Sequence, residues 1–409
     1  MSADNTLSFD SHLLGKASLS EILRTGARRL LMQAIEQEVE EYIASNISEK
    51  DSDGKRLVVR NGYSKERSVQ TGIGTFDISM PRVHDKRPDK HFTSRLLPPY
   101  LRKTKEIEEL IPWLYLKGIS TGDFSDALVS ILGENSKGFS ANTVVRLKEA
   151  WQEDYEVWNK RKFSESEYVY IFADGVYFNL RLEGERQCIL VIMGVKSDGT
   201  KELVAVEDGV RESEMSWTQI LIDLKNRGFT NGPELAIGDG ALGFWNAMEK
   251  IYPQSKHQRC WVHKTANVLN KLPKGQQPQA KSLLNEIYMS STKKDSIIAW
   301  RKFVTIFQDK YPKAVECLDK NKNDLLTFYD FPAAHWIHIR TSNSIESLFA
   351  TVRLRHRKTK GSATAKACLA MVFKLAQNAQ KGWRKIKGYE KLIDVVNKIE
   401  FIDGIRKAA

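Results

Sequence analysis

Three acidic residues stand in sequence contexts that are typical of catalytic carboxylates. Asp174 follows an apolar run with strand character, Asp239 follows a second such run, and Glu346 stands at the start of a predicted helix. Carboxylate oxygens are hard ligands of the kind that Mg²⁺ prefers. Three of them together are able to hold two metal ions, which stabilise the attacking and the leaving oxygen of a phosphodiester. We therefore predict a site for two Mg²⁺ ions, or for two Mn²⁺ ions in their place.

Each of these residues also has a plainer interpretation. Asp174 and Asp239 both precede a glycine, and Asp-Gly pairs are common in turns. Asp198 and Asp208 precede a glycine as well, and there we accept the turn interpretation. Glu346 lies near the start of its helix, where a capping glutamate often stands. The carboxylates are therefore candidates whose role depends on whether the fold brings them together.

Basic residues continue the helix that begins near Glu346. Arg353, Arg357 and Lys360 follow at helical spacing and therefore share a helical face with that carboxylate. A carboxylate that binds metal and is continued by a row of cations suits a phosphate backbone. The residues that we expect to contact DNA are Arg82, Lys86, Arg87, Arg340, Arg353, Arg357, Lys358 and Lys360.

Cys260 and His263 form a C-x2-H pair between the second and third carboxylates. Together with His335 and His338, they would offer four ligands to a tetrahedral zinc ion. However, 72 residues separate His263 from His335, and a buried cysteine beside a hydrogen-bonded histidine is the more ordinary arrangement. A cysteine nucleophile paired with His263 is also disfavoured, because no third orienting group is visible.

Residues 168–263 must position the two aspartates. Alternation with period two predicts strands, and apolar residues at helical spacing predict helices. Their order is strand, strand, strand, helix, strand, helix and strand, which is typical of the α/β ribonuclease H-like fold. The first and fourth strands are neighbours in its mixed five-stranded sheet, so we expect Asp174 and Asp239 to face one another. The expected strands are residues 168–182, in one piece or two, then 188–196, 202–207, 235–238 and 256–263.

We expect six segments along the chain. The basic arm of the segment 56–105 is equally well interpreted as a solvated linker. The helices of the segment 106–160 have a plainer interpretation as a three-helix packing unit. The apolar face of a helix predicted at residues 18–48 needs a partner, either in this chain or in a second copy. The segments are 1–55, a helical dimerisation or DNA-binding segment; 56–105, a small β element and basic arm; 106–160, a helical DNA-binding unit of helix-turn-helix type; 161–263, the first part of the core; 264–335, an all-α insertion; and 336–409, the last part of the core with a basic helix and C-terminal helices.

Charge and composition limit the class of protein. The 409 residues include 63 Lys and Arg against 51 Asp and Glu, a net charge of +12, which favours a polyanionic partner and above all nucleic acid. The four cysteines are far apart, so a reducing cytoplasm fits best. Neither an export signal nor a long apolar run is found. We therefore expect a cytoplasmic, nucleoid-associated protein that does not enter a membrane.

Several motifs resemble those of the bacterial Mutator-type insertion-sequence transposases, a family of DDE transposases. Around the candidate site they are D-G-A-L-G-F from Asp239, Q-R-C-W-V-H up to His263, and R-T-S-N-S-I-E up to Glu346. Upstream, R-N-G-Y at 60–63, M-P-R at 80–82 and K-G-I-S-T at 117–121 also resemble that family, so the resemblance covers nearly the whole chain. One departure is Gly122, where members often carry an arginine.

This resemblance implies that Asp174, Asp239 and Glu346 form a catalytic triad on a ribonuclease H-like fold interrupted by a helical insertion. Cys260 and His263 would be the C-x2-H pair of the family, which supports the site structurally. The resemblance further implies Mg²⁺-dependent cleavage and strand transfer at terminal inverted repeats. The partners would be the double-stranded DNA of the transposon ends and of the target, bound by a homodimer or a larger synaptic assembly.

The leading hypothesis is therefore a DNA transposase. A stand-alone metal-dependent nuclease of the same fold would cut DNA without joining it. A non-catalytic DNA-binding protein is the third alternative, and the presence of all three acidic residues argues against it. Short inverted repeats that bracket the gene would favour the transposase over both alternatives.

Overall fold

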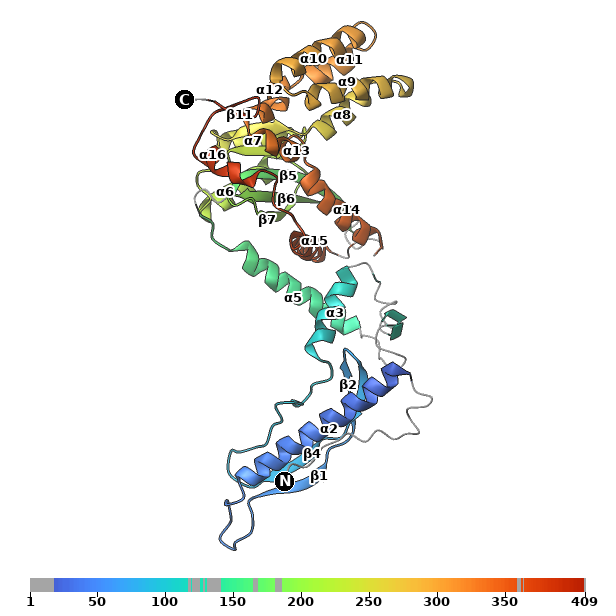
Figure 1. Cartoon of the computed structure of the whole chain (residues 1–409), viewed down its shortest axis with the longest axis vertical. Coiled ribbons are helices and arrows are strands. Elements are labelled where there is room, and N and C mark those ends of the chain that lie inside the picture. The colour runs from blue at the N-terminus through green and yellow to red at the C-terminus, as the bar shows by residue number, and fades with distance from the viewer. Residues whose placement is uncertain are drawn as a thin grey trace. The chain divides into compact units, whose positions relative to one another are not determined.

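The chain divides into two compact units, Met1–Val144 and Val145–Ala409. The computed structural model, drawn in Figure 1, describes residues 18–116, 119, 126–127, 129–130, 141–164, 168–180, 186–358, 362 and 364–407. No helix in this described part of the chain is long and apolar enough to cross a membrane.

The N-terminal unit packs a long helix, α2 (Leu19–Ser45), against small antiparallel sheets. Ser18 and Glu21 form a capping box at the start of α2. Buried Ile35 lies in a small core with residues of the sheets and of the segment after them, so part of the apolar face of α2 has its partner within this unit. The strands pair as β1 (Val58–Tyr63) with β4 (Pro81–Asp85), and β2 (Arg67–Thr71) with β3 (Gly74–Ile78).

Two of the three helices expected between residues 106 and 158 are present. They are α3 (Lys105–Leu116) and α5 (Ala141–Asn159). The helix expected between them, at residues 121–132, falls almost entirely outside the described residues. The interpretation of this region as a DNA-binding unit therefore stays a prediction.

A mixed five-stranded sheet forms the centre of the second unit, as the sequence predicts. The strand order is β7-β6-β5-β8-β9, with antiparallel pairing on the β7 side and parallel pairing of β5 with β8 and of β8 with β9. The first expected strand is continuous. The strands are β5 (Tyr168–Asn179), β6 (Arg186–Lys196), β7 (Lys201–Gly209), β8 (Leu235–Gly238) and β9 (Lys256–Arg259).

Helices cover both faces of this sheet (Figure 1). On one face, α6 (Glu214–Asn226) and α7 (Leu242–Ile251) bury large side chains such as Trp217 and Phe244 against the strands. On the other face, α14 (Asn343–Lys358) contacts β5, and α15 (Ala365–Gln380) contacts β7. Because apolar side chains fill both sides, the central strands read as nearly continuous apolar runs.

The expectation for the last strand is wrong at its end. The strand stops at Arg259, and helix α8 (Trp261–Leu269) begins directly, with Cys260 as its N-cap residue. The amide of Cys260 still donates to Gly238 of β8, but the carbonyl of Cys260 accepts from Lys264 in the first helical turn. Buried Trp261 and Val268 lie at i and i+7, a helical spacing, and the short apolar run of residues 260–262 does not distinguish a strand from a helix.

Residues 264–335 are all described and contain no strand, as expected for the helical insertion. The longer helices after α8 are α9 (Gln277–Met289), α10 (Lys293–Phe307) and α11 (Pro312–Asp319). The short helices α12 (Lys322–Leu325) and α13 (Trp336–Ile339) lead back to α14. After α15 the chain ends in α16 (Leu392–Val396) and a hairpin of β10 (Phe401–Ile402) and β11 (Ile405–Arg406), which the sequence analysis does not anticipate.

Candidate active site

The fold brings Asp174 and Asp239 together at one edge of the sheet. Ala173 of β5 pairs in parallel with Gly238 of β8, so the two aspartates that follow are adjacent. Their carboxylates and that of Glu212 each offer an oxygen, and these oxygens lie within 4.8 Å of one another. Backbone amides orient two of these groups, because Gly175 donates to Asp174 and Ala241 donates to Asp239, both at 2.8 Å.

Glu212 is a residue of this cluster that the sequence analysis misses. It follows β7 and precedes α6, whose N-cap is Ser213. Strand β7 is antiparallel to β6, which is antiparallel to β5, so β7 and β5 end at the same edge of the sheet. Carboxyl ends of strands in α/β sheets are common places for binding residues. A carboxylate in the short segment between the third expected strand and the helix after it was therefore the available signal.

Two glycines make room for Glu212. A Cβ atom on Gly175 would lie 2.6 Å from Cγ of Glu212, which is closer than real Cβ contacts. A Cβ atom on Gly243, in the first turn of α7, would lie 2.4 Å from the carbonyl oxygen of Glu212. The side chain and the backbone of Glu212 thus each occupy space that a glycine leaves open.

The three carboxylates repel one another. Burial, followed by the charge of Asp239, raises the pKa of Asp174 to about 7. Burial and Asp239 also raise the pKa of Glu212. Since crowding and desolvation both disfavour the ionised carboxylates, a divalent cation would relieve the repulsion, and hard oxygen donors are the ligands that Mg²⁺ prefers. The donor set therefore fits a magnesium ion.

Glu346 lies in a neighbouring cluster with Cys260 and His263, whose ligand atoms are within 4.8 Å of one another. Ser342 connects the three: its hydroxyl is 2.8 Å from Oε1 of Glu346, 3.2 Å from Sγ of Cys260 and 3.4 Å from Nδ1 of His263. Its amide also donates to Cys260, at 3.2 Å. The carboxylate of Glu346 thus contacts the hydroxyl of the residue that precedes α14, and its role as a cap or as a metal ligand stays a prediction.

His263 carries the positive charge between the two clusters. Its hydrogen bond with Cys260, together with the charges of Cys260, Asp174 and Asp239, outweighs burial and raises the pKa of His263 to about 9. Burial opposes ionisation of the Cys260 thiol, but hydrogen bonds with His263 and Ser342 give a net lowering of its pKa. A protonated His263 is therefore the group through which Asp174 and Asp239 are electrostatically coupled to the Glu346 cluster.

The four-residue zinc site is not formed. Both ring nitrogens of buried His335 are occupied, by the Tyr170 hydroxyl and by the Gly388 carbonyl, each at 2.8 Å. Nε2 of His338 accepts a hydrogen bond from the amide of Lys387 at 2.9 Å. These histidines hold the C-terminal segment and are not ligands that could join Cys260.

A comparison with known families matches residues 4–386 to the model of the Mutator family of transposases. The chain belongs to the Mutator transposase family. It is 48% identical over 280 residues to the transposase of insertion sequence IS6120 from Mycolicibacterium smegmatis, covering 68% of this chain and 86% of that one. It is 47% identical over 280 residues to the transposase of IST2 from Acidithiobacillus ferrooxidans, covering 68% and 95%.

A solved structure that is similar to part of this transposase is the catalytic core domain of HTLV-2 integrase in complex with magnesium. The similarity covers 32% of this chain and 93% of the integrase core, at 14% sequence identity and a TM-score of 0.18. A score this low does not establish a common fold.

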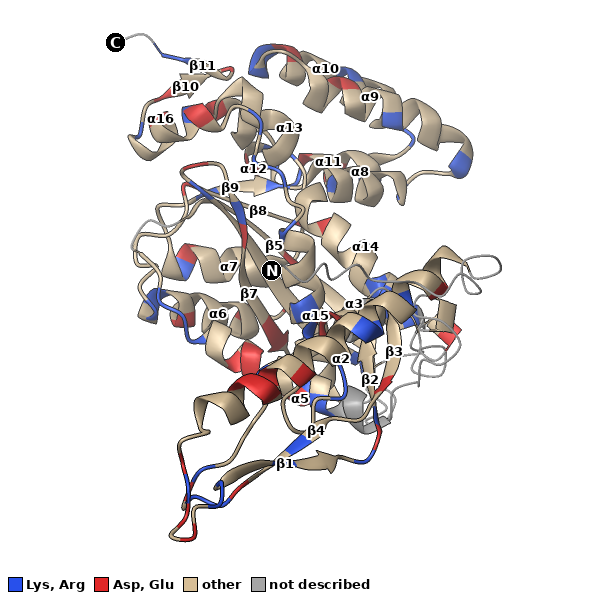
Figure 2. Ribbon diagram, turned by 60° about the horizontal axis from the view of Figure 1, so that its bottom comes forward, with Lys and Arg blue, Asp and Glu red and all other residues tan. Residues whose placement is uncertain are grey.

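The predicted DNA contacts of this transposase fall into different environments. Arg353 and Arg357 are exposed on α14 beyond Glu346, among the cationic residues drawn in Figure 2. Arg340 is half-buried and donates to the carbonyl of Tyr288 at 3.0 Å. Arg82 and Lys86 are exposed in the N-terminal unit. Of the remaining two predicted contacts on the C-terminal side, Lys358 ends α14, and Lys360 lies outside the described residues.

Arg87 has a structural role that sequence reasoning misses. Its guanidinium donates to both carboxylate oxygens of Asp85, at 2.9 and 2.7 Å, and also to Asn46 and Tyr42. These bonds use most of the five N–H groups of an arginine. The Arg87 side chain is only 10% exposed, so this geometry speaks against the predicted phosphate contact.

Proposed function

We propose that this transposase cleaves DNA strands at the terminal inverted repeats of its element and joins the freed ends to target DNA. The observation that carries the proposal is the convergence of Asp174, Asp239 and Glu212 at one edge of the sheet, with His263 between them and Glu346. In this proposal, water attacks the phosphodiester at the element end. The freed 3′-hydroxyl then attacks the target strand at the same site.

We infer that Asp174 and Asp239 hold Mg²⁺, with Glu212 and Glu346 as the further carboxylates around them. Bound Mg²⁺ would stabilise the charge on the attacking and leaving oxygens of the phosphodiester. Ser342 orients Glu346 through the 2.8 Å contact with its carboxylate. Nδ1 of His263 lies 3.8 Å from the same oxygen.

The wider architecture supports the same proposal. The strand order and the parallel pairing of β5 with β8 are those expected for a ribonuclease H-like core, and the all-helical residues 264–335 separate its last carboxylate from the others. We infer that the exposed cations of α14 and of the N-terminal unit bind double-stranded DNA. We also infer a homodimer or larger assembly, since both ends of the element must be held close to each other while they are joined to target DNA.

The proposal is tested by cleavage and joining of labelled DNA that carries the inverted repeats of the element, with Mg²⁺ and with EDTA. We compare the wild type with Glu346→Gln, which keeps the shape of the side chain and loses its charge, and use Ser347→Ala on the exposed side of α14 as a control. The wild type and the control should cut and join only with Mg²⁺, while Glu346→Gln binds DNA without cutting it.

Two results would contradict the proposal. Full activity of Glu346→Gln would remove Glu346 from the catalytic site. Cleavage by the wild type without joining, under all target DNA conditions, would favour a stand-alone nuclease.

A further inference from the structure

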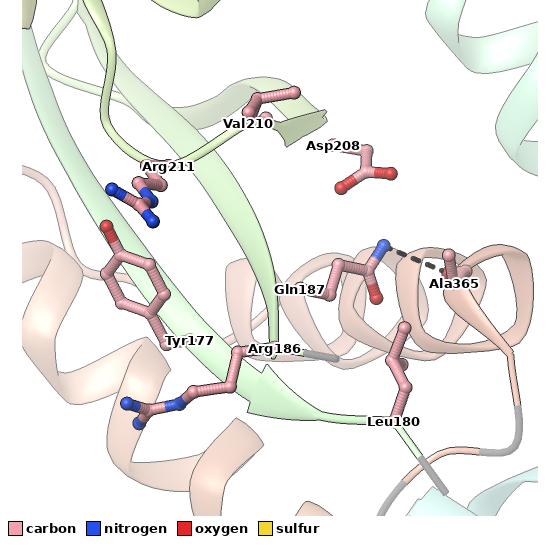
Figure 3. A pocket seen from close by; sticks show the side chains of 9 residues that line it. Tyr177, Leu180, Arg186, Gln187, Asp208, Val210, Arg211 and Ala365 are labelled. Carbon is pink, nitrogen blue, oxygen red and sulfur yellow. Dashed lines mark hydrogen bonds between the residues drawn. The ribbon is translucent and has the colours of Figure 1, made fainter. Parts of the chain in front are cut away.

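A cavity of about 750 Å³ opens beside the acidic cluster, at the end of β5, β6 and β7 (Figure 3). Its size is within the range of roughly 300–1,000 Å³ that is usual for small-molecule pockets. We call it the hairpin pocket, because residues at the end of β5 and at the start of β6, which pair as antiparallel neighbours, line it. Its lining includes Tyr177, Leu180, Arg186, Gln187, Asp208 and Arg211.

The hairpin pocket adjoins the candidate active site. Arg211 directly precedes Glu212, and Tyr177 lies three residues after Asp174 on the same strand. Burial, followed by the charges of Cys188 and Glu212, raises the pKa of Tyr177 to about 12, so the Tyr177 side chain lies near the Glu212 carboxylate. The pocket therefore lies beside the acidic cluster on the side of Glu212.

One side of the pocket combines an aromatic ring with two cations. Tyr177 is 39% exposed, and the guanidinium of Arg186 lies 5.8 Å from the centre of its ring. Arg211 is exposed and stands in the left-handed region at φ 61°, a backbone conformation that costs energy for a residue other than glycine. Within the described part of the chain, neither arginine forms an ion pair with a carboxylate. A guanidinium group presents N–H donors that match the oxygens of a phosphate.

The other side of the pocket offers hydrogen-bond acceptors. Gln187 is 6% exposed, and its Nε2 is held by the carbonyl of Ala365 at 3.2 Å. Its Oε1 is buried and has no hydrogen-bond partner among the described residues. Buried polar atoms are seldom left unpaired. The carboxylate of Asp208, which also lines the pocket, suits the N–H donors of a base edge and not a second phosphate.

We propose that the hairpin pocket binds an unpaired nucleotide of the DNA strand next to the cleaved phosphodiester, with a base stacked on Tyr177 and a phosphate held by Arg186 and Arg211. The base must leave the duplex, because paired bases are covered by their neighbours in the stack. Stacking on an aromatic side chain accepts any base, whereas the acceptor wall favours bases with N–H donors. This inference rests on the proposed function of the adjacent site.

The test uses duplexes of the element end that carry 2-aminopurine, in turn, at each position within a few nucleotides of the cleavage site. Binding of the wild type should change the fluorescence at one position, as expected when the base leaves the stack. Tyr177→Ala should abolish that change, and Tyr177→Phe should restore it because the ring remains. Tyr389→Ala is the matched control, since Tyr389 is another exposed tyrosine with a cation, Lys385, over its ring.

A second arm replaces single phosphates next to that position with neutral methylphosphonates. The replacement should weaken binding of the wild type several-fold and have little further effect in Arg211→Gln. The anisotropy of the same duplexes reports overall DNA binding, and circular dichroism checks that each variant is folded. An unchanged fluorescence response in Tyr177→Ala, or no responding position in a wild type that binds the duplex, overturns the pocket inference alone. A wild type that does not bind the duplex overturns the proposed function as well.

Discussion

The environment of Asp174 has a consequence for stability. Its pKa is raised to about 7 by burial and by Asp239, from an ordinary value of 3.8. The folded chain therefore binds this proton more tightly than the unfolded chain does. In the absence of metal, the folded protein loses stability as the pH rises from about 4 to about 7, because the unfolded state releases the proton first.

We predict that Asp174→Asn removes this loss. Without metal, the variant should be more stable than the wild type at pH 8, by up to about 4 kcal/mol for a pKa change of about three. The advantage should shrink toward pH 5, where the folded wild type still holds the proton of Asp174 and only the unfolded chain has released it, so that part of the loss has not yet occurred. Urea unfolding in EDTA at the two pH values measures it. The same difference at both values would show that Asp174 does not titrate in this range.

Residue reasoning proposes Asp174, Asp239 and Glu346 from apolar strand-like runs and a helix start, but it does not single out Glu212 or Ser342. Glu212 follows β7. Its position is a sequence signal only when β7 is known to run parallel to β5, which depends on the order of the strands in the sheet. Ser342 acts through contacts with residues 79 and 82 positions earlier in the chain. Such contacts follow from tertiary packing, and local sequence does not encode them.

Ser342 connects the start of α8 to the start of α14 through its hydrogen bonds. Its amide and hydroxyl reach Cys260, and its hydroxyl reaches Glu346. These two helices border the helical insertion in the sequence, so the link fixes the third predicted carboxylate relative to the sheet edge.

We expect Ser342→Ala to lower the free energy of unfolding by about 1–2 kcal/mol, because it removes buried hydrogen bonds of the hydroxyl. It should also slow DNA cleavage, since Glu346 loses its orienting contact. Ser347→Ala, which removes only a hydroxyl bond within α14, should change stability by less than about 0.5 kcal/mol. Chemical denaturation gives the comparison, and equal stability of the two variants would show that the link contributes nothing.

The two glycines around Glu212 should respond differently to alanine. Gly175→Ala meets the side chain of Glu212, which can move away, so we expect weaker metal binding with a small loss of stability. Gly243→Ala meets the backbone of residues 212–214, which cannot yield easily, so we expect a loss of about 1–3 kcal/mol. Thermal unfolding with and without Mn²⁺ separates the two effects. A larger stability loss in Gly175→Ala would contradict this packing.

The order of strands and helices is predicted well because strong periodic patterns specify each element. The end of β9 is not predicted, because the short apolar run of residues 260–262 is compatible both with a strand and with the first turn of α8. The hairpin of β10 and β11 is also not predicted, because a strand of two residues is too short to show a periodic pattern. Short elements are defined by their partners, and the amide of Ala333 donating to Gly404 is one such partner contact.

Taken over the whole chain, a net charge of +12 predicts DNA affinity that falls steeply with salt. If Arg353 and Arg357 contact phosphates, each change to glutamine should weaken binding to all sequences alike and reduce the slope of log affinity against log salt by about one. Lys302→Gln is the control, because Lys302 pairs with Glu286 in the helical insertion. If the slope of log affinity against log salt is unchanged in both arginine variants, the DNA backbone does not contact α14 at these residues.

The most direct test of the central claim is Mn²⁺ binding measured by electron paramagnetic resonance at neutral pH, without DNA. The wild type should bind Mn²⁺, and Asp174→Asn and Glu212→Gln should each weaken binding by about tenfold or more, as loss of groups at a metal site does. Glu214→Gln, two residues along and paired with Lys250, should bind like the wild type. If Asp174→Asn binds Mn²⁺ as tightly as the wild type, the acidic cluster is not the metal site. If Glu212→Gln alone binds Mn²⁺ as tightly as the wild type, Glu212 is a neighbour of the metal site and not a ligand.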